Sequence, residues 1–211
     1  NECQKRKDVE AIVKEEGHDY SPISLANFPK LPETICLDGY FQSYKYFEEE
    51  FETICDITGI TDHRNEFEKE VQMRKLPIGD ISMHFRLGDY CNLPHAHPVM
   101  PKEYYRNALQ YMIDTIQPET PYKNLKVLYF CEIMDNNYVY ENYISYLMTL
   151  FPQCDFILAN QIMQDWKQML YMSLCKHHII GNSTFSLWAA MLNPSKEKLV
   201  CYPWHWLDRK S

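Results

Sequence analysis

The sequence contains no apolar run of the roughly 18 to 20 residues that a membrane-spanning helix needs. It also lacks an excess of basic residues, since 29 Asp and Glu outnumber 21 Lys and Arg and give a net charge of -8 at pH 7. A broad surface for nucleic acid or for an anionic membrane needs positive charge. We therefore expect no membrane span in this chain and no nucleic-acid partner, and any bound phosphate must be held by a few local groups.

The eight cysteines include no Cys-x-x-Cys pair, and several lie inside apolar runs. This pattern favours reduced, buried thiols over a disulfide framework. We therefore expect a cytoplasmic location, with the Golgi lumen open if the natural chain carries an N-terminal anchor. Possible metal ligands occur at His95-x-His97 and at Cys175-x-His177-His178. Neither has the spacing of a zinc framework, so no metal is expected.

The chain changes character near residue 76. Between Tyr40 and Arg74, acidic and aromatic residues alternate with apolar ones at helical spacing. From Ile81 onwards, short apolar runs alternate with helical patterns four times, which is typical of a parallel sheet with right-handed crossovers. We expect an α/β fold in two parts, a mainly helical N-terminal portion at 1–75 and a Rossmann-like domain at 76–211.

The first strand of that pattern presents His84 and Arg86 on one face, directly before Gly88. Ligands of parallel α/β sheets bind outside the carboxyl ends of the strands, where both side chains are expected. Arg offers a planar fork of donors suited to a pyrophosphate, and Asp89 is placed to orient it. From the spacing alone, a surface Arg paired with Asp89 beside a satisfied His is an equally good interpretation.

A second candidate segment, Gly181 to Ser186, places small hydroxyl residues between a predicted strand at 178–180 and a predicted helix at 185–192. The unpaired backbone N–H groups and the dipole of a helix N-terminus form an anion site. A phosphate fits this segment, and an ordinary Ser or Thr helix cap is the alternative.

Three ordered segments resemble the α-1,2-fucosyltransferases over roughly residues 37–193. They are Leu37 to Phe47, His84-Phe85-Arg86-Leu87-Gly88-Asp89-Tyr90, and Ile179-Ile180-Gly181-Asn182-Ser183-Thr184-Phe185-Ser186-Leu187-Trp188. The resemblance implies a GT-B glycosyltransferase whose Rossmann-like lobe binds GDP-L-fucose. Such an enzyme inverts the anomeric centre and uses no metal or other cofactor. The implied reaction transfers L-fucose to a hydroxyl of a glycan acceptor, in an α-1,2 linkage to galactose.

The resemblance also implies roles for individual residues. Arg86 is expected to bind the β-phosphate, where charge builds up as the sugar leaves, and His84 to contact the nucleotide. Asp165 is expected to accept hydrogen bonds from guanine, although Asp at a helix start is also a common cap. The residues expected around the phosphates and the ribose are Asn182, Ser183, Thr184, Phe185 and Ser186.

Inverting transfer needs a base that takes the proton of the acceptor hydroxyl. Asp89, His95, His97 and Glu103 lie near enough in the sequence to compete for this role. His97 is the first choice, because a His at about this distance after the Arg motif is familiar from the family. A loop histidine without a role is the alternative.

The sequence departs from the family pattern in three places. Leu87 stands where a second Arg is usual, and Gly181 and Leu187 replace a common Ala and Trp. The usual opening segment Gly-Gly-Leu-Gly-Asn-Gln has no counterpart, which predicts a reduced or missing first lobe. Two rival functions therefore stay open: a catalytically silent nucleotide- or glycan-binding module, and a transferase that uses another nucleotide sugar.

Overall fold

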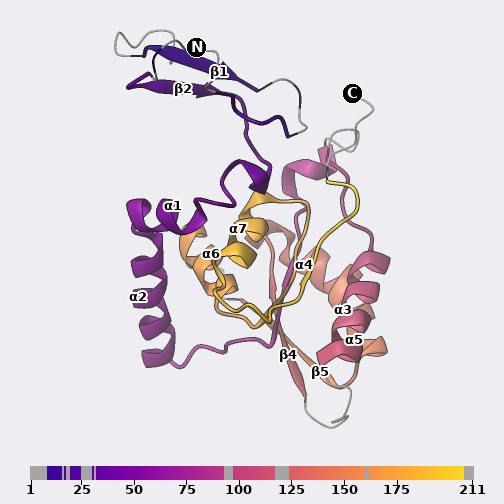
Figure 1. Cartoon of the computed structure of the whole chain (residues 1–211). Helices are drawn as coiled ribbons and strands as arrows, with labels where there is room; N and C mark the ends of the chain where they lie inside the picture. Colours follow the sequence, from indigo (N-terminus) through magenta and orange to yellow (C-terminus); the bar gives the residue numbers. More distant parts are fainter. Residues whose placement is uncertain are drawn as a thin grey trace. The chain divides into compact units, whose positions relative to one another are not determined.

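The structure is a computed structural model, shown in Figure 1, and describes residues 9–15, 17, 20–24, 30, 32–92, 97–116, 124–159 and 162–206. The chain forms two compact units, Asn1–Ile60 and Thr61–Ser211. The expected division of roles between 1–75 and 76–211 stays a prediction. Among the described residues, no helix is long and apolar enough to cross a bilayer.

The first unit contains a parallel pair of strands, β1 (Ala11–Lys14) and β2 (Ile35–Asp38), followed by the 3-10 turn η2 (Tyr44–Tyr46) and helix α1 (Phe51–Thr58). The prediction of a mainly helical portion missed this strand pair, because four-residue strands are too short to show a clear period of two. Helix α1 ends at Gly59, whose φ of 66° is the left-handed conformation that favours glycine.

Most of the cysteines in the described part of the chain follow the expectation of reduced thiols. Cys36 on β2 is disulfide-bonded, so the expectation is wrong for this residue. Outside disulfides lie Cys55, Cys91, Cys131, Cys154, Cys175 and Cys201. Burial raises the pKa of Cys154 and of Cys175 to about 12, so both stay protonated and pack as small apolar side chains. The cellular compartment stays a prediction.

The second unit is built around a five-stranded parallel sheet in the order β5-β4-β3-β6-β7. Its strands are β3 (Ile81–His84), β4 (Leu125–Phe130), β5 (Cys154–Leu158), β6 (His177–Ile179) and β7 (Val200–Cys201). Within this sheet, the chain forms the central strand β3 first and then β4 and β5 on one side of it. It then returns to form β6 on the other side of β3. The strand order therefore reverses between β3 and β6, and the expected parallel α/β sheet is confirmed.

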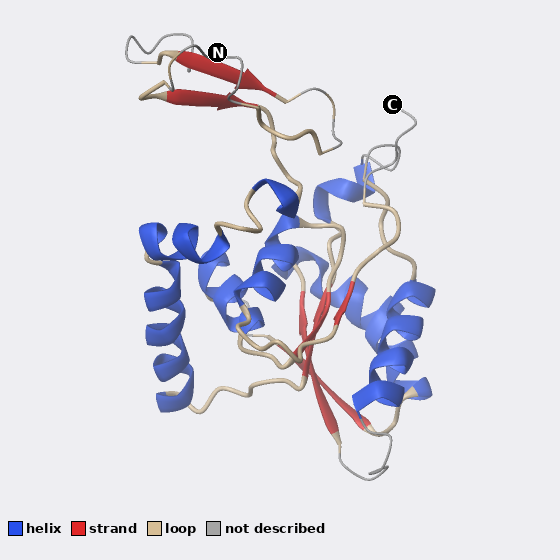
Figure 2. Ribbon diagram, in the orientation of Figure 1, coloured by secondary structure: helices blue, strands red, loops and turns tan. Residues whose placement is uncertain are grey.

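Helices cover both faces of this sheet, as Figure 2 shows. One face carries α3 (Lys102–Ile116) and the helical stretch formed by α4 (Asn136–Val139), a π-helical turn (Tyr140–Ile144) and α5 (Ser145–Leu150). The other face carries α6 (Asp165–Ser173) and α7 (Thr184–Leu192). Helix α2 (Ile60–Met73) lies beside α6, and its Arg64 donates a hydrogen bond to Ser173. The helical patterns of the sequence, at about 103–116, 138–150, 165–175 and 185–192, predict these elements to within a few residues.

The central strand β3 is buried on both faces, which is usual for parallel sheets with helices on each side. Ile81, Met83 and Phe85 point into the main apolar core, where they join Tyr105 and Leu109 of α3. The opposite face of β3 carries polar groups instead. The core thus fixes the direction in which the alternate side chains of β3 point.

A buried polar network on this opposite face ties β3 to β6. His178, which is fully buried, has Nδ1 2.8 Å from the Ser82 hydroxyl and Nε2 2.9 Å from the Asn193 amide nitrogen. Asn193 also donates to the carbonyl of Cys175 at 2.8 Å. Burial, aided by the charge of Lys198, lowers the pKa of His178 to about 3, so its imidazole is neutral at pH 7.

We predict that acidification destabilises the second unit well before His84 and His178 become charged in the folded state. The folded pKa of His178, like that of His84, is about 3 against an ordinary value of 6.5. The unfolded chain therefore binds more protons below pH 6.5, and stability falls as the pH drops from 6.5 towards 3. Each pKa unit corresponds to about 1.4 kcal/mol, so the loss by pH 4 is on the order of several kcal/mol.

Urea unfolding between pH 7 and pH 4 measures this slope. His178→Gln keeps hydrogen-bonding groups but loses the titration, and its unfolding free energy should depend less steeply on pH than that of the wild type. Equal slopes, or a wild-type free energy that stays constant down to pH 4, would contradict the assignment of a neutral buried imidazole.

Candidate functional site

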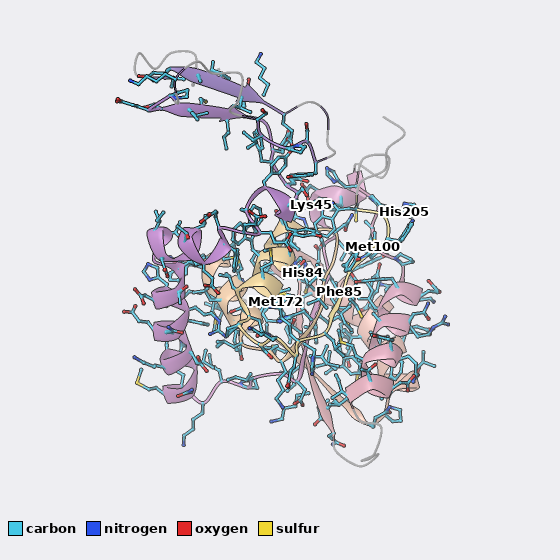
Figure 3. The ribbon with its side chains drawn as sticks, in the orientation of Figure 1. Lys45, His84, Phe85, Met100, Met172 and His205 are labelled. Atoms are coloured by element: carbon cyan, nitrogen blue, oxygen red, sulfur yellow. The ribbon has the colours of Figure 1, made fainter. Side chains whose placement is uncertain are left out.

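The two candidate segments meet where the strand order reverses. A Cβ placed on Gly181, which follows β6, would lie 3.3 Å from the carbonyl oxygen of His84 and 3.8 Å from Cβ of Arg86. The rings of His84 and Phe185 are 5.2 Å apart between centroids. Figure 3 labels His84 at the carboxyl end of β3. Segments nearly a hundred residues apart in the sequence thus form one site, at the position where ligands bind in doubly wound sheets.

His84 is a neutral, buried hydrogen-bonding group. It is 6% exposed, and burial, with the charge of Arg86 adding to it, lowers its pKa to about 3. Its backbone carbonyl accepts a hydrogen bond from the Tyr105 hydroxyl at 3.1 Å, while its ring atom Nδ1 has no partner. The side chain therefore offers one ring nitrogen that a ligand or water can bind.

Arg86 lies between two carboxylates. Its Nη1 donates to Glu132, and its Nη2 donates to Asp89 at 2.6 Å. The guanidinium also lies over the ring of Tyr90, 5.1 Å from the centroid. Asp89 is therefore placed to orient Arg86 as the sequence suggested, but both ends of the guanidinium fork already hold anionic oxygens.

Glu132 was missed by the sequence analysis. It follows the last residue of β4, Phe130, by two positions, and β4 pairs with β3. The carboxyl ends of adjacent parallel strands lie at the same edge of the sheet, so a charged residue just after the neighbouring strand was a usable signal. Asp135, three residues further on, accepts a hydrogen bond from the backbone N–H of Gly88 at 2.9 Å.

The segment before α7 presents its backbone N–H groups at the site. Ser183 occupies the N-cap position, yet its hydroxyl makes no capping hydrogen bond, so the ordinary helix cap considered for this segment is not present. The hydroxyl of Ser186 donates back to the carbonyl of Ser183 at 3.1 Å. Thr184 is exposed at the first position of the helix and Phe185 stacks near His84. The unpaired N–H groups of this first turn can bind an anion.

Tyr90 joins the two segments and brings His97 to them. Its hydroxyl donates to the carbonyl of Asn182 at 3.2 Å, and its ring stacks on that of His97 with centroids 4.4 Å apart. The side chain of Asn182 is 1% exposed and donates to the carbonyls of Pro98 and Trp206. His97 therefore belongs to the same site as Arg86, while the competing His95 lies outside the described residues.

The unsatisfied polar groups of the second unit gather at this site. Among the described residues, the buried side-chain atoms without a hydrogen-bond partner are His84 Nδ1, His97 Nδ1 and Asn182 Oδ1. Buried polar atoms are nearly always paired in native proteins. Their concentration beside Arg86 and the first turn of α7 indicates a site that a polar ligand or bound water completes.

Two other candidates are not joined to this cluster. Asp165 is exposed at the first position of α6, and within the described part of the chain no hydrogen bond or ion pair links it to Arg86 or Asn182. Glu103 is exposed in the first turn of α3. The role of Asp165 in binding guanine therefore stays a prediction, and it rests on the resemblance alone.

A metal site receives no support from these side chains. Both ring nitrogens of His178 are used by Ser82 and Asn193, and Nδ1 of His177 accepts a hydrogen bond from the backbone of Leu199. The thiol of Cys175 is fully protonated at neutral pH. Among the described residues, no group of three or more His, Cys, Asp or Glu side chains is arranged to hold an ion.

Two surface pockets of the described residues lie elsewhere. One is lined by α3, including Tyr104, by β7 and by Tyr202 after it, and the other lies between α2 and α6, beside Arg74 and Lys167. Neither pocket holds unpartnered buried polar atoms. We therefore assign the site to the carboxyl ends of β3 and β6, on the basis of its chemistry.

Comparison with known proteins gives a consistent picture. Residues 5–208 match the family model described as glycosyl transferase family 11. The O-antigen biosynthesis glycosyltransferase WbnK of Escherichia coli is 28% identical over 178 residues, which cover 81% of this chain and 55% of that protein. An alpha-1,2-colitosyltransferase of Escherichia coli is 29% identical over 179 residues, which cover 82% of this chain and 56% of that protein.

The chain thus spans about half the length of the curated relatives that it matches. Among solved structures, a glycosyl transferase family 9 protein from Veillonella parvula aligns with 67% of this chain and 36% of its own. The sequence identity is 16% and the TM-score is 0.35, which is too low to identify a shared fold.

We predict that inorganic pyrophosphate binds this site through Arg86. A ligand that binds only the folded state stabilises it, by about 2.7 kcal/mol at a hundredfold excess over Kd, which raises the melting temperature by about 5 °C or more. Arg86→Ala should remove this shift, and Arg86→Lys should restore little of it, because a point charge does not replace the bidentate fork.

Thermal unfolding with and without pyrophosphate measures the effect. Arg74→Ala is the matched control, since Arg74 also pairs with a glutamate, Glu70, at 2.8 Å. An undiminished shift in Arg86→Ala together with its loss in Arg74→Ala would place the anion in the pocket between α2 and α6 instead.

Proposed function

The chain belongs to glycosyl transferase family 11, and we propose that the protein transfers L-fucose from GDP-fucose to a galactose hydroxyl of a glycan acceptor. The linkage formed is α-1,2, and the anomeric centre is inverted. One observation carries the proposal: the Arg86 segment and the Gly181–Ser186 segment, which resemble the α-1,2-fucosyltransferases, meet at the strand-order reversal around unpartnered buried polar atoms. The described part of the sheet acts as the donor-binding lobe of a GT-B enzyme.

The diphosphate of the donor is held by Arg86 and by the N–H groups at the start of α7. Negative charge builds up on the β-phosphate as the bond to the sugar breaks. Groups that already point at this charge stabilise the transition state more than the ground state, which is what accelerates the reaction. Asp89 keeps the guanidinium in position through its hydrogen bond to Nη2.

The ribose is bound by uncharged groups and the guanine by a carboxylate. His84 supplies its free ring atom Nδ1, and Asn182 supplies its free oxygen Oδ1 as an acceptor for a hydroxyl of the ribose. Ser183, Thr184 and Ser186 line the same turn of backbone. Asp165, exposed at the start of α6, accepts hydrogen bonds from the guanine edge.

The acceptor hydroxyl is deprotonated by His97. In an inverting displacement the hydroxyl attacks from the side opposite the leaving phosphate, so the base stands away from the group that binds that phosphate. Asp89 is bonded directly to Arg86 and therefore lies on the phosphate side. His97 keeps an unpartnered ring nitrogen and is held by its stack on Tyr90, which suits a base.

A second candidate donor carries colitose, another deoxy sugar. Similarity to an alpha-1,2-colitosyltransferase favours it, and the same similarity supports the α-1,2 linkage. The site described above binds the diphosphate in either case. Comparing GDP-fucose with GDP-colitose as donors separates the two.

We predict that this chain binds GDP and GDP-fucose but transfers the sugar slowly by itself. Transfer requires an acceptor held in place, and such positioning is worth about 7 to 11 kcal/mol of the barrier. The chain spans about half the length of its curated relatives, so we expect it to provide only part of this positioning. A form extended to the full length of the relatives should release GDP from GDP-fucose at least about a hundredfold faster in the presence of a galactoside.

Calorimetry with GDP and a GDP-release assay on both forms measure the two steps separately. Failure of both forms to bind GDP would overturn the donor assignment. Binding without turnover in the extended form would favour the silent binding module. Equal, fast turnover in the short form would show that residues 1–75 already provide the acceptor side.

We also predict that chelators leave the transfer rate unchanged. Arg86 and the helix N–H groups meet the charge of the leaving diphosphate, so no divalent ion is needed. The rate should be the same in EDTA and after magnesium or manganese is added back. A rate that collapses in EDTA and recovers with either metal would contradict this account of the leaving group.

A further inference from the structure

The carboxylate of Glu132 sits in the position where an incoming anion would be expected. It accepts a hydrogen bond from Nη1 of Arg86. A Cβ placed on Gly88 would meet its two carboxylate oxygens at 3.1 Å each and its carbon Cδ at 3.2 Å. One carboxylate therefore occupies both the Nη1 side of the guanidinium fork and the space above the glycine backbone, which turns with φ 39°.

This arrangement leaves no spare positive charge for a diphosphate. Arg86 is neutralised by Glu132 and Asp89, and Asp135 is bonded to the backbone N–H of Gly88. Leu87 is 3% exposed and belongs to the apolar core, so it contributes nothing to the charge. A diphosphate added beside these carboxylates would be repelled unless one of them moved away.

Glu132 is the carboxylate that is free to move. Its side chain is 48% exposed, so its ion pair with Arg86 is weak and its charge is readily solvated. Asp89, three residues from Arg86 on the same turn, is more exposed still at 62%, but its departure would leave Glu132 in the space above Gly88. Departure of Glu132 alone frees Nη1 of Arg86 and uncovers Gly88, while Asp89 still holds Nη2.

We propose that Glu132 is an internal occupant of the anion position formed by Arg86 and Gly88, and that the diphosphate of the donor displaces it. The identity of the donor rests on the function proposed above, whereas the displacement concerns any diphosphate. Glu132 thereby lowers the affinity of the site for phosphates in general. A ligand must supply enough further contacts to move it, and this favours a complete nucleotide over free phosphate.

Replacing Glu132 by its uncharged isostere tests the displacement. In Glu132→Gln the competing charge is gone, so inorganic pyrophosphate and GDP should both bind about three- to tenfold more tightly than to the wild type by calorimetry. The melting temperature without ligand should change little, because the ion pair is half exposed. A residue that merely supports the fold would weaken binding or lower this temperature when replaced.

Two further variants make the result specific. Glu68→Gln removes the same charge from a glutamate that pairs with Arg64 on α2 at 3.8 Å, and its affinities should equal those of the wild type. In a background of Arg86→Ala, the substitution at Glu132 should not restore the wild-type affinity, because the anion position has then lost its guanidinium. Wild-type affinity in that double variant would show that Arg86 is no part of the anion position and would overturn the proposal.

The remaining outcomes separate the displacement from the identity of the donor. Tighter pyrophosphate binding in Glu132→Gln with no binding of GDP would support the displacement and reject GDP-fucose as donor. Weaker binding of both ligands in Glu132→Gln would overturn the displacement and make Glu132 a support for Arg86. Binding of neither ligand to either protein would overturn both proposals.

Discussion

The parallel pairing of β6 with β3 is the constraint on which the site depends. The chain leaves β3 in one direction, reaches the edge of the sheet at β5, and returns to form β6 on the other side of β3. Only this return brings Gly181 against His84 and Arg86, joins Tyr90 to Asn182 and places Phe185 of α7 beside His84. The buried contact of His178 with Ser82 fixes the register of the same two strands.

The electrostatics of the site follow from the burial of the sheet. His84 and His178 are held neutral because the interior disfavours their charged forms, so neither adds to the binding of an anion. The charge for that task is carried by Arg86, at the edge of the buried region, and it is balanced by acidic neighbours. A site of this kind binds anions selectively, since a ligand must offer more than negative charge to be held.

Much of the second unit could be predicted from the sequence, because apolar runs and helical periodicity report elements directly. The positions of His84 and Arg86 at the end of β3 and the pairing of Arg86 with Asp89 followed from local spacing. Glu132 and the link through Tyr90 did not, since they depend on which strands are neighbours. The pair β1 and β2 and the disulfide of Cys36 were missed because short strands and bond partners leave little trace in local composition.

Backbone hydrogen exchange with and without GDP tests the central claim most directly, because it locates the ligand without any substitution. GDP should slow exchange in the loop at 86–91, after β3, and at 181–187, where α7 begins, while exchange in the loops at the amino ends of the strands stays unchanged. Protection confined to the pocket of α3 and β7, or to the pocket between α2 and α6, would show that the nucleotide does not bind where the strand order reverses.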